Sequence, residues 1–377
     1  MKVVVAMDSF KGSLTSLEAG YAAKEGICRA LENAEVCVTP LADGGEGTVE
    51  ALLNRGSKEM ISVTGPLGAP VQCSYGILEN GCAVIEIACA AGLTLIPQEA
   101  RNPLNATTFG VGEVIKDAIH KGCRNFIVGL GGSATNDGGI GMLQALGFGM
   151  LGKDGKQVAM GAMGLKELVA ITNENALPQL KECTFRIACD VNNPLCGERG
   201  ASAVFGPQKG ANGDAVRDMD AWLKSYADLA AEQYEGADPT KAGAGAAGGL
   251  GFAFMTFLNA TMEFGVQLVL KETGLEEKVK NADIVVTGEG RLDGQSVMGK
   301  APIGVAQLAK KYQKTVLAFC GSAAEDARRC LNAGIDAYFP IVQEVVDLKT
   351  AMTPSVAKRN LTATAEQVFR LIQTIWN

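Results

Sequence analysis

The sequence predicts an α/β protein with a Rossmann-like doubly wound parallel sheet and a second, inserted α/β domain. Short apolar runs alternate with segments of helical spacing along most of the chain, which is typical of parallel strands joined by helices. The 377 residues are enough for about two domains. The 47 glycines occur without low-complexity tracts, which favours many tight turns between regular elements rather than disorder.

The amino-terminal part begins with a strand, a polar loop and a helix. Residues 2–7 are a β-branched apolar run, and residues 13–31 have helical spacing. Residues 36–40 predict the next strand, and residues 48–54 predict the helix that follows its glycine-rich loop. The same alternation continues with a helix over 109–122, a strand over 125–132 and a helix over 138–147. This order of elements indicates a parallel doubly wound sheet.

The carboxyl-terminal part repeats the pattern. Strands are predicted over 281–286, 314–322 and 336–340, and helices over 301–312 and 325–334. A long amphipathic helix over 355–377 closes the chain.

Two stretches interrupt the alternation. Residues 61–104 contain strand-like runs joined by turn signals without a helix between them, which is a hairpin pattern, and residues 149–245 are mixed and rich in loops. We therefore expect a Rossmann-like domain formed by 1–60, 105–148 and 246–377, and a discontinuous second domain formed by 61–104 and 149–245. Ligands of open parallel sheets bind outside the carboxyl ends of the strands, so the active site is expected in the cleft between the two domains.

Composition excludes several classes of protein. A net charge of −7 without basic runs argues against nucleic-acid binding, and it means that an anionic ligand needs local cations. The amino terminus lacks the pattern of a signal peptide and no run is long enough to span a bilayer, so we expect a cytoplasmic protein that does not bind membranes. Eleven cysteines without a CxxC pair, and a single histidine (His120) placed late in a helix, favour reduced thiols over a zinc site.

Six loops share an unusual composition of acids, small hydroxyls and glycine, and each follows an apolar run. They are 8–16, 42–48, 129–139, 189–197, 205–211 and 287–296. One acid in such a loop is usually only a helix cap. Several strand ends that present these residues at the same edge of a sheet instead favour a site for a polar ligand.

The chemistry of these loops fits an anion with a divalent cation. The stretch GLGGSATND lets backbone N–H groups approach a phosphate just before a helix, although small residues also suit a tight strand-to-helix turn. Carboxylates supply the hard oxygen donors that Mg²⁺ prefers. Two glycine patterns, at 129–134 and 243–248, lack the context that dinucleotide binding requires.

The chain resembles the type I glycerate kinases, a bacterial family, through seven motifs in order along nearly its full length. These are DSFKGSL, ADGGEGT, GGSATNDGG, ACDVNNPLCG, VFGPQKGA, GAGAAGGLG and TGEGRLDGQS with GKAPIGVA. The family often has Pro where this chain has Met7. The resemblance implies a two-domain α/β fold and a Mg²⁺-dependent phosphorylation of glycerate by ATP. It favours 2-phosphoglycerate as product over 3-phosphoglycerate.

Residue roles are predicted from chemistry rather than from the family. We expect Asp190, Lys11 and Arg291 to be catalytic, with Asp190 as the base or hydroxyl-orienting acid and the two cations on anionic groups. The remaining expected site residues are Asp8, Ser9, Lys209 and Lys300 for the substrate, Gly131, Gly132, Ser133 and Thr135 for phosphate or nucleotide, and Glu289, Asp293 and Asp43 for the metal.

Two other classes of protein remain alternatives at this point. A nicotinamide-dependent oxidoreductase could use the same sheet, but no acid ends a second strand about twenty residues after the glycine pattern. A non-catalytic binder of small acids would explain the cations, but it does not need a carboxylate cluster. The expected partners are therefore glycerate and ATP, and the oligomeric state is open between monomer and homodimer.

Overall fold

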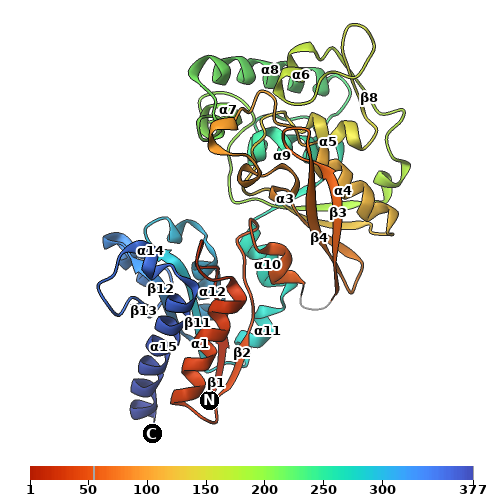
Figure 1. Ribbon diagram of the computed structural model, residues 1–377. Coiled ribbons are helices and arrows are strands. Elements are labelled where there is room, and N and C mark those ends of the chain that lie inside the picture. Colours follow the sequence, from red (N-terminus) through yellow and green to blue (C-terminus); the bar gives the residue numbers. More distant parts are fainter. Residues whose placement is uncertain (54–55, 377) are drawn as a thin grey trace. The chain divides into compact units, whose positions relative to one another are not determined.

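The computed structural model describes residues 1–53 and 56–376, and within them the chain forms two compact units (Figure 1). Unit 1 comprises Met1–Asp43, Glu50–Leu52 and Val266–Asn377, and unit 2 comprises Gly44–Val49 and Leu53–Gly265. Asn54, the last residue of one predicted helix, and Asn377, the last residue of another, lie outside the described residues. Each unit has a parallel or largely parallel sheet of its own.

Unit 1 contains a five-stranded parallel sheet in the order β13-β12-β11-β1-β2. Its strands are β1 (Lys2–Val5), β2 (Glu35–Val38), β11 (Ile284–Leu292), β12 (Thr315–Ala323) and β13 (Ala337–Pro340). The chain moves outward to β2 on one side of β1 and later outward through β11 on the other side. The order of strands therefore reverses between β1 and β11, where doubly wound sheets usually bind ligands.

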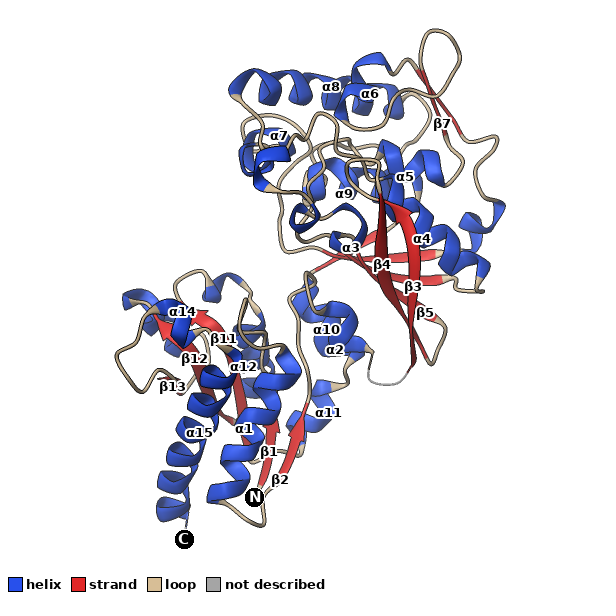
Figure 2. Ribbon diagram, in the orientation of Figure 1, coloured by secondary structure: helices blue, strands red, loops and turns tan. Residues whose placement is uncertain are grey.

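Helices cover both faces of this sheet, as the strand sequences require (Figure 2). Alternate residues such as Val3 and Val5 share a hydrophobic core with α1 (Ser16–Ala30) and α15 (Pro354–Trp376). The intervening Val4 and Val285 are also buried, and α12 (Ala301–Lys311) packs against β11 and β12. Strands buried on both faces read as continuous apolar runs, which is why the sequence predicts them clearly.

The remaining helices of unit 1 are short. They are α10 (Gly265–Glu272), whose first residue belongs to unit 2, α11 (Leu275–Lys280), α13 (Arg329–Asn332) and α14 (Leu348–Ala351), while α2 (Thr48–Leu52) contributes residues to both units. The long helix α1 begins with a capping box, in which Thr15 and Glu18 each accept a hydrogen bond from the other's backbone N–H.

Unit 2 contains a six-stranded mixed sheet in the order β10-β9-β6-β5-β4-β3. Antiparallel pairing joins β3 (Gly56–Thr64) to β4 (Pro70–Leu78) and β4 to β5 (Cys82–Glu86), as the hairpin pattern predicts. Parallel pairing joins β5, β6 (Asn125–Gly129), β9 (Thr184–Ala188) and β10 (Thr261–Glu263). A small antiparallel pair, β7 (Gly149–Leu151) and β8 (Ala170–Thr172), is separate from this sheet.

The helices of unit 2 surround a single hydrophobic core that includes Phe126, Phe185 and Phe254. They are α3 (Ala88–Ala91), α4 (Phe109–His120), α5 (Ile140–Ala145), α6 (Ala162–Glu167), α7 (Ala201–Phe205), α8 (Gly213–Ala231) and α9 (Leu250–Phe257). His120 ends α4, the position expected for a cation near a helix carboxyl terminus.

The observed division differs from the predicted domain boundaries. Residues 105–148, assigned from sequence to the first domain, belong to unit 2, because β6 pairs with β5 and β9 rather than with β1. Residues 246–265 also belong to unit 2, since β10 pairs with β9. The alternation of strand and helix is the same in both units, so periodicity could not tell which sheet a given strand joins.

No helix within the described residues is both long enough and apolar enough to cross a bilayer.

Candidate active site

The topology of unit 1 brings a polar loop and a polar strand end together at one edge of its sheet. Because β1 (ending at Val5) and β11 (ending at Leu292) are parallel neighbours, the loop after β1 lies beside the carboxyl-terminal half of β11. The backbone N–H of Asp8 donates a hydrogen bond of 2.8 Å to the carbonyl of Gly288, which extends the pairing from β11 to this loop. Lys11 and Arg291, far apart in sequence, therefore lie in one neighbourhood.

The first loop turns back on itself directly after β1. Phe10 and Leu14 form an isolated antiparallel bridge, and Gly12 has φ of 77°, a backbone conformation that side chains rarely adopt. The Asp8 carboxylate accepts a hydrogen bond of 2.7 Å from the backbone N–H of Ser9. The Lys11 ammonium lies 3.4 Å from Asp43 Oδ2 and is largely exposed, so it remains accessible to a ligand.

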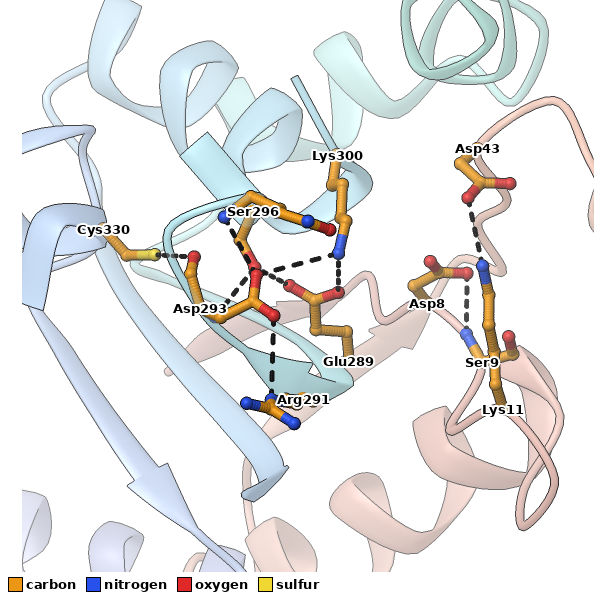
Figure 3. A network of polar contacts seen from close by, with 11 residues as sticks. Asp8, Ser9, Lys11, Asp43, Glu289, Arg291, Asp293, Ser296, Lys300 and Cys330 are labelled. Carbon is orange, nitrogen blue, oxygen red and sulfur yellow. Dashed lines mark hydrogen bonds and ion pairs between the residues drawn. The ribbon is translucent and has the colours of Figure 1, made fainter. Parts of the chain in front are cut away.

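The carboxyl end of β11 and the loop after it carry a network of charges centred on Glu289 and Asp293 (Figure 3). Ser296 Oγ donates a hydrogen bond of 2.5 Å to Glu289 Oε1. Lys300 Nζ lies 3.8 Å from Glu289 Oε2 and 3.9 Å from Asp293 Oδ1, so this ammonium joins the two carboxylates. Arg291 Nε lies 3.7 Å from Asp293 Oδ2, and the Arg291 side chain is 69% exposed.

Burial and neighbouring charges perturb the acids of these loops. Asp8 is only 5% exposed, and its burial, helped by the charge of Asp43, raises the pKa of Asp8 from 3.8 to about 7. Burial likewise raises the pKa of Glu289 above its usual range. The charge of Asp43 raises the pKa of Lys11, which stays protonated. Two buried carboxyl groups of raised pKa, Asp8 and Glu289, therefore lie near the ammonium of Lys11.

These residues line a pocket of about 450 Å³ within unit 1. Asp8, Ser9, Lys11, Asp43, Glu289, Arg291, Asp293 and Lys300, eight of the predicted site residues, all contribute to its wall. Pockets of this size are typical of small-molecule sites. The sequence prediction of a polar strand end is thus matched by a pocket at the point where the strand order reverses.

The residues predicted to hold a metal ion do not form a cluster of their own. Among the described residues, no group of three or more acidic, Cys or His side chains is arranged to bind a metal. Glu289 and Asp293 are joined by Lys300, whereas Asp43 lies against Lys11. This donor set does not resemble an all-protein cage. It fits a cation that arrives with phosphates, because such Mg²⁺ ions use only one or two protein carboxylates.

The other predicted site residues lie in unit 2. Gly131 and Gly132 are exposed in the loop after β6, but Ser133 is nearly buried and Thr135 is fully buried. Thr135 Oγ1 has no hydrogen-bond partner among the described residues and no contact with solvent, so it does not face a ligand in this structure. The prediction of a phosphate loop is therefore consistent with only the first part of this stretch.

Lys209 lies inside unit 2 rather than at its surface. It is 2% exposed, and its ammonium donates to Ser133 Oγ at 2.9 Å and to the carbonyl of Thr135 at 2.6 Å. Burial lowers the pKa of Lys209 to about 7. Lys209 therefore stabilises the glycine loop from its buried side. This role differs from the predicted contact with substrate.

Asp190 follows β9 and is exposed. Its Oδ1 accepts a hydrogen bond of 2.9 Å from the backbone N–H of Gly265. The carboxylate is therefore accessible, but part of its hydrogen-bonding capacity serves the backbone.

Sequence reasoning missed one wall of the pocket in unit 1. Ile341, Leu348, Met352 and Asn360 line it, and they come from the segment between β13 and α15 and from α15 itself. The signal was the run IVQEVVDLKTAM, which keeps several apolar residues although it follows the last strand and precedes the closing helix. Apolar residues in a loop between two elements are explained if they line a pocket.

Comparison with known proteins identifies the class to which this fold and site belong. The model of the glycerate kinase family matches residues 3–373. A glycerate kinase of Haemophilus influenzae is 46% identical over 375 residues, covering 99% of both chains. A glycerate 2-kinase of Escherichia coli is 43% identical over 372 residues, covering 97% of this chain and 98% of the relative.

A solved structure agrees with this result. The crystal structure of a candidate glycerate kinase 2 from Salmonella typhimurium LT2 superimposes with a TM-score of 0.90 at 42% identity, covering 99% of this chain and 98% of that one. The fold is thus that of an α/β small-molecule kinase. The chain belongs to the glycerate kinase family.

Proposed function

We propose that this protein transfers the terminal phosphoryl group of ATP to the 2-hydroxyl of D-glycerate and releases 2-phosphoglycerate. Phosphorylation of glycerate with ATP as donor is the activity that membership of the family implies. The name of the Escherichia coli relative, glycerate 2-kinase, supports the choice of hydroxyl. The observation that carries the proposal is the pocket of unit 1, which gathers Lys11, Arg291 and Lys300 beside buried carboxyl groups.

The cations of this pocket suit the charges that the reaction must stabilise. Phosphoryl transfer depends mainly on positioning and electrostatics, because negative charge spreads over the transferring group. The exposed guanidinium of Arg291 can bind a carboxylate or phosphate in bidentate fashion, which an ammonium cannot do. Lys11 and Lys300 then act as point charges on the phosphates.

Magnesium enters this scheme as part of the nucleotide. Glu289 and Asp293 supply hard oxygen donors at one place, and Asp43 is the alternative donor beside Lys11. When bound, the ion neutralises charge on the phosphates. The protein residues would hold the complex of Mg²⁺ and nucleotide. Lys300 lies between the Glu289 and Asp293 carboxylates, which would meet the ion.

Two carboxylates are candidates for the group that orients or deprotonates the substrate hydroxyl. Asp190 is accessible at the end of β9, as the sequence prediction requires. Asp8 lines the pocket itself, and a carboxyl with a pKa of about 7 is well matched to proton transfer at neutral pH. We therefore add Asp8 to the catalytic candidates and keep Asp190 as the alternative.

The glycine loop of unit 2 is proposed as a second anion-binding element. Gly131 and Gly132 expose backbone that a phosphate or carboxylate can approach closely. Ser133 and Thr135 support this loop through the buried ammonium of Lys209. The residues that contact the ligand are then the two glycines, and the buried side chains fix their conformation.

The first experiment is ³¹P NMR of the purified protein with D-glycerate, ATP and Mg²⁺. We expect the phosphorus signal of 2-phosphoglycerate to appear as ATP is consumed, and none without enzyme. A signal of 3-phosphoglycerate would keep the activity and overturn the choice of hydroxyl. ATP binding without any phosphoglycerate would overturn glycerate as the substrate.

A further inference from the structure

The wall of the unit 1 pocket contains two chemically different sets of residues. One set consists of the acids and cations described above. The other set, the apolar wall, consists of Phe10, Ile341, Val342, Leu348 and Met352. A three-carbon acid has no apolar group that would need such a wall, so glycerate does not explain these residues.

Two residues of the apolar wall are exposed to a large extent. Leu348 is 74% exposed and Val342 is 44% exposed, although both line the pocket. Single exposed apolar residues are ordinary, but two at the wall of one concave site favour a place where an apolar ligand surface is buried.

One glycine fixes this wall to the charged loop. A Cβ at Gly12 would lie 2.9 Å from the Met352 methyl, so the absence of a side chain there allows Met352 to pack directly on the loop that carries Lys11. The apolar wall therefore begins one residue away from a cation that faces the same pocket.

A buried polar residue, Asn360, also lines the pocket. Asn360 on α15 is only 6% exposed and lines the pocket. The structure gives this amide no hydrogen bond to another described residue, and its atoms are not among the polar atoms that are shut off from solvent without a partner. An amide at a pocket wall with free donors and acceptors can bind a ligand that carries matching groups.

We propose that the apolar wall binds the adenine base of ATP, with Leu348 and Met352 against the ring and the Asn360 amide on the edge that carries the 6-amino group. This inference deepens the proposed function and rests on it. Adenine combines a flat apolar face with a donor beside an acceptor, a pair that an asparagine amide can match. The phosphates then extend from the base to Lys11, Arg291 and Lys300.

Calorimetric titration of the full-length protein with ADP tests the apolar contact. We expect Leu348→Ala to weaken ADP binding about tenfold, because the variant loses apolar contact with the base. Leu348 is exposed in the free protein, so the substitution should not disturb the packing of the hydrophobic core. Leu371→Ala is the matched control, because Leu371 is also exposed at 61% but does not line the pocket. Equal affinities of wild type, Leu348→Ala and Leu371→Ala, or no ADP binding by wild type, would overturn the proposal.

A double-mutant cycle tests the role of Asn360. The diphosphate of purine riboside lacks the 6-amino group, so we expect it to bind wild type about fivefold more weakly than ADP does. In Asn360→Leu the two ligands should bind equally, because the amide that distinguishes them is gone. An undiminished preference for ADP in Asn360→Leu would show that Asn360 does not read the base.

The two proposals can fail separately. Formation of 2-phosphoglycerate by wild type, together with unchanged ADP binding in Leu348→Ala and Asn360→Leu, would keep the reaction and move the base elsewhere. Weakened ADP binding in both variants, without any phosphoglycerate from wild type, would keep the nucleotide site and replace the acceptor.

Discussion

The burial of the Asp8 carboxyl group lowers the free energy of unfolding at high pH. Its burial raises its pKa from 3.8 to about 7, so the folded protein keeps a proton that the unfolded chain has already lost over this range. Stability from this group is present below pH 3.8 and is lost as the pH rises to about 7. At pH 8 the cost of the buried carboxylate is complete, and it amounts to at most about 4 kcal/mol.

We therefore expect Asp8→Asn to be more stable than wild type at pH 8 and to be at least a hundredfold less active. The gain in stability should shrink as the pH falls from 7 toward 5. Thermal unfolding at several pH values, without nucleotide and with a chelator to remove divalent cations, measures it. A difference that stays constant over this range would mean that the Asp8 carboxyl does not titrate as its burial implies.

Arg291 gives a second test at the residue scale. Its side chain is exposed, so Arg291→Ala should leave the melting temperature almost unchanged while it lowers kcat/KM at least a hundredfold. Asp190→Asn should have an effect of similar size if Asp190 is the base. Steady-state kinetics with glycerate and ATP varied in turn would show whether each variant affects kcat or the KM of either substrate. Near-normal turnover in either variant would remove that residue from the catalytic set.

At this scale the sequence predicted which residue types gather at the pocket, because acids and cations after buried strands have few structural uses. It did not predict the state of each side chain. Lys209 and Thr135 look like ligand contacts in sequence, yet both are buried. Burial of a polar side chain depends on which loop covers it, and that information lies in residues far along the chain.

Among the elements, the contact between α1 and α15 depends on one glycine. A Cβ at Gly26 would lie 2.2 Å from the carbonyl of Thr362 and 2.9 Å from the Ala365 Cβ. In an isolated helix, alanine would be favoured over glycine by about 1 kcal/mol. The close approach of the two helices outweighs this preference.

We expect Gly26→Ala to lower the free energy of unfolding by about 1–3 kcal/mol, as overpacked positions do. Gly213→Ala is a matched control, because a Cβ there meets nothing closer than 3.7 Å. Urea denaturation of both variants gives the comparison. Unchanged or increased stability of Gly26→Ala would show that the two helices can separate at no cost.

The elements themselves were predicted well wherever periodicity is strong. The helices near residues 16–30, 109–120 and 301–311 and four of the five strands of the unit 1 sheet occur where the pattern of apolar residues places them, whereas β11 continues to Leu292 through residues that were predicted as a polar loop. The short helix α14 was not predicted, since four residues carry too little periodicity to be seen.

For the molecule as a whole, the eleven cysteines give a simple prediction. All of them are free, and Cys73, Cys82, Cys123, Cys320 and Cys330 are buried. Titration of the denatured protein without reductant should find eleven thiols, and the melting temperature should not depend on reductant. Fewer titratable thiols in freshly purified protein would contradict the reduced state that burial supports.

Domain assignment was the weakest part of the sequence prediction at this scale. Both units are built from the same alternation of strands and helices, and the choice of sheet for β6 is made by pairing with β5 and β9. Partner choice between strands depends on contacts between distant segments, which a single sequence does not display.

The pairing of β1 with β11 has a consequence for the protein during its synthesis. Residues 3–5 can pair with β2 early, but their other partner, residues 284–286, emerges only after about three-quarters of the chain. At about 5–20 residues per second, the ribosome needs roughly 15–55 s to reach it. One edge of β1 therefore stays open while unit 2 is completed, and the pocket of unit 1 cannot form before residues 341–360 of its wall have been synthesised.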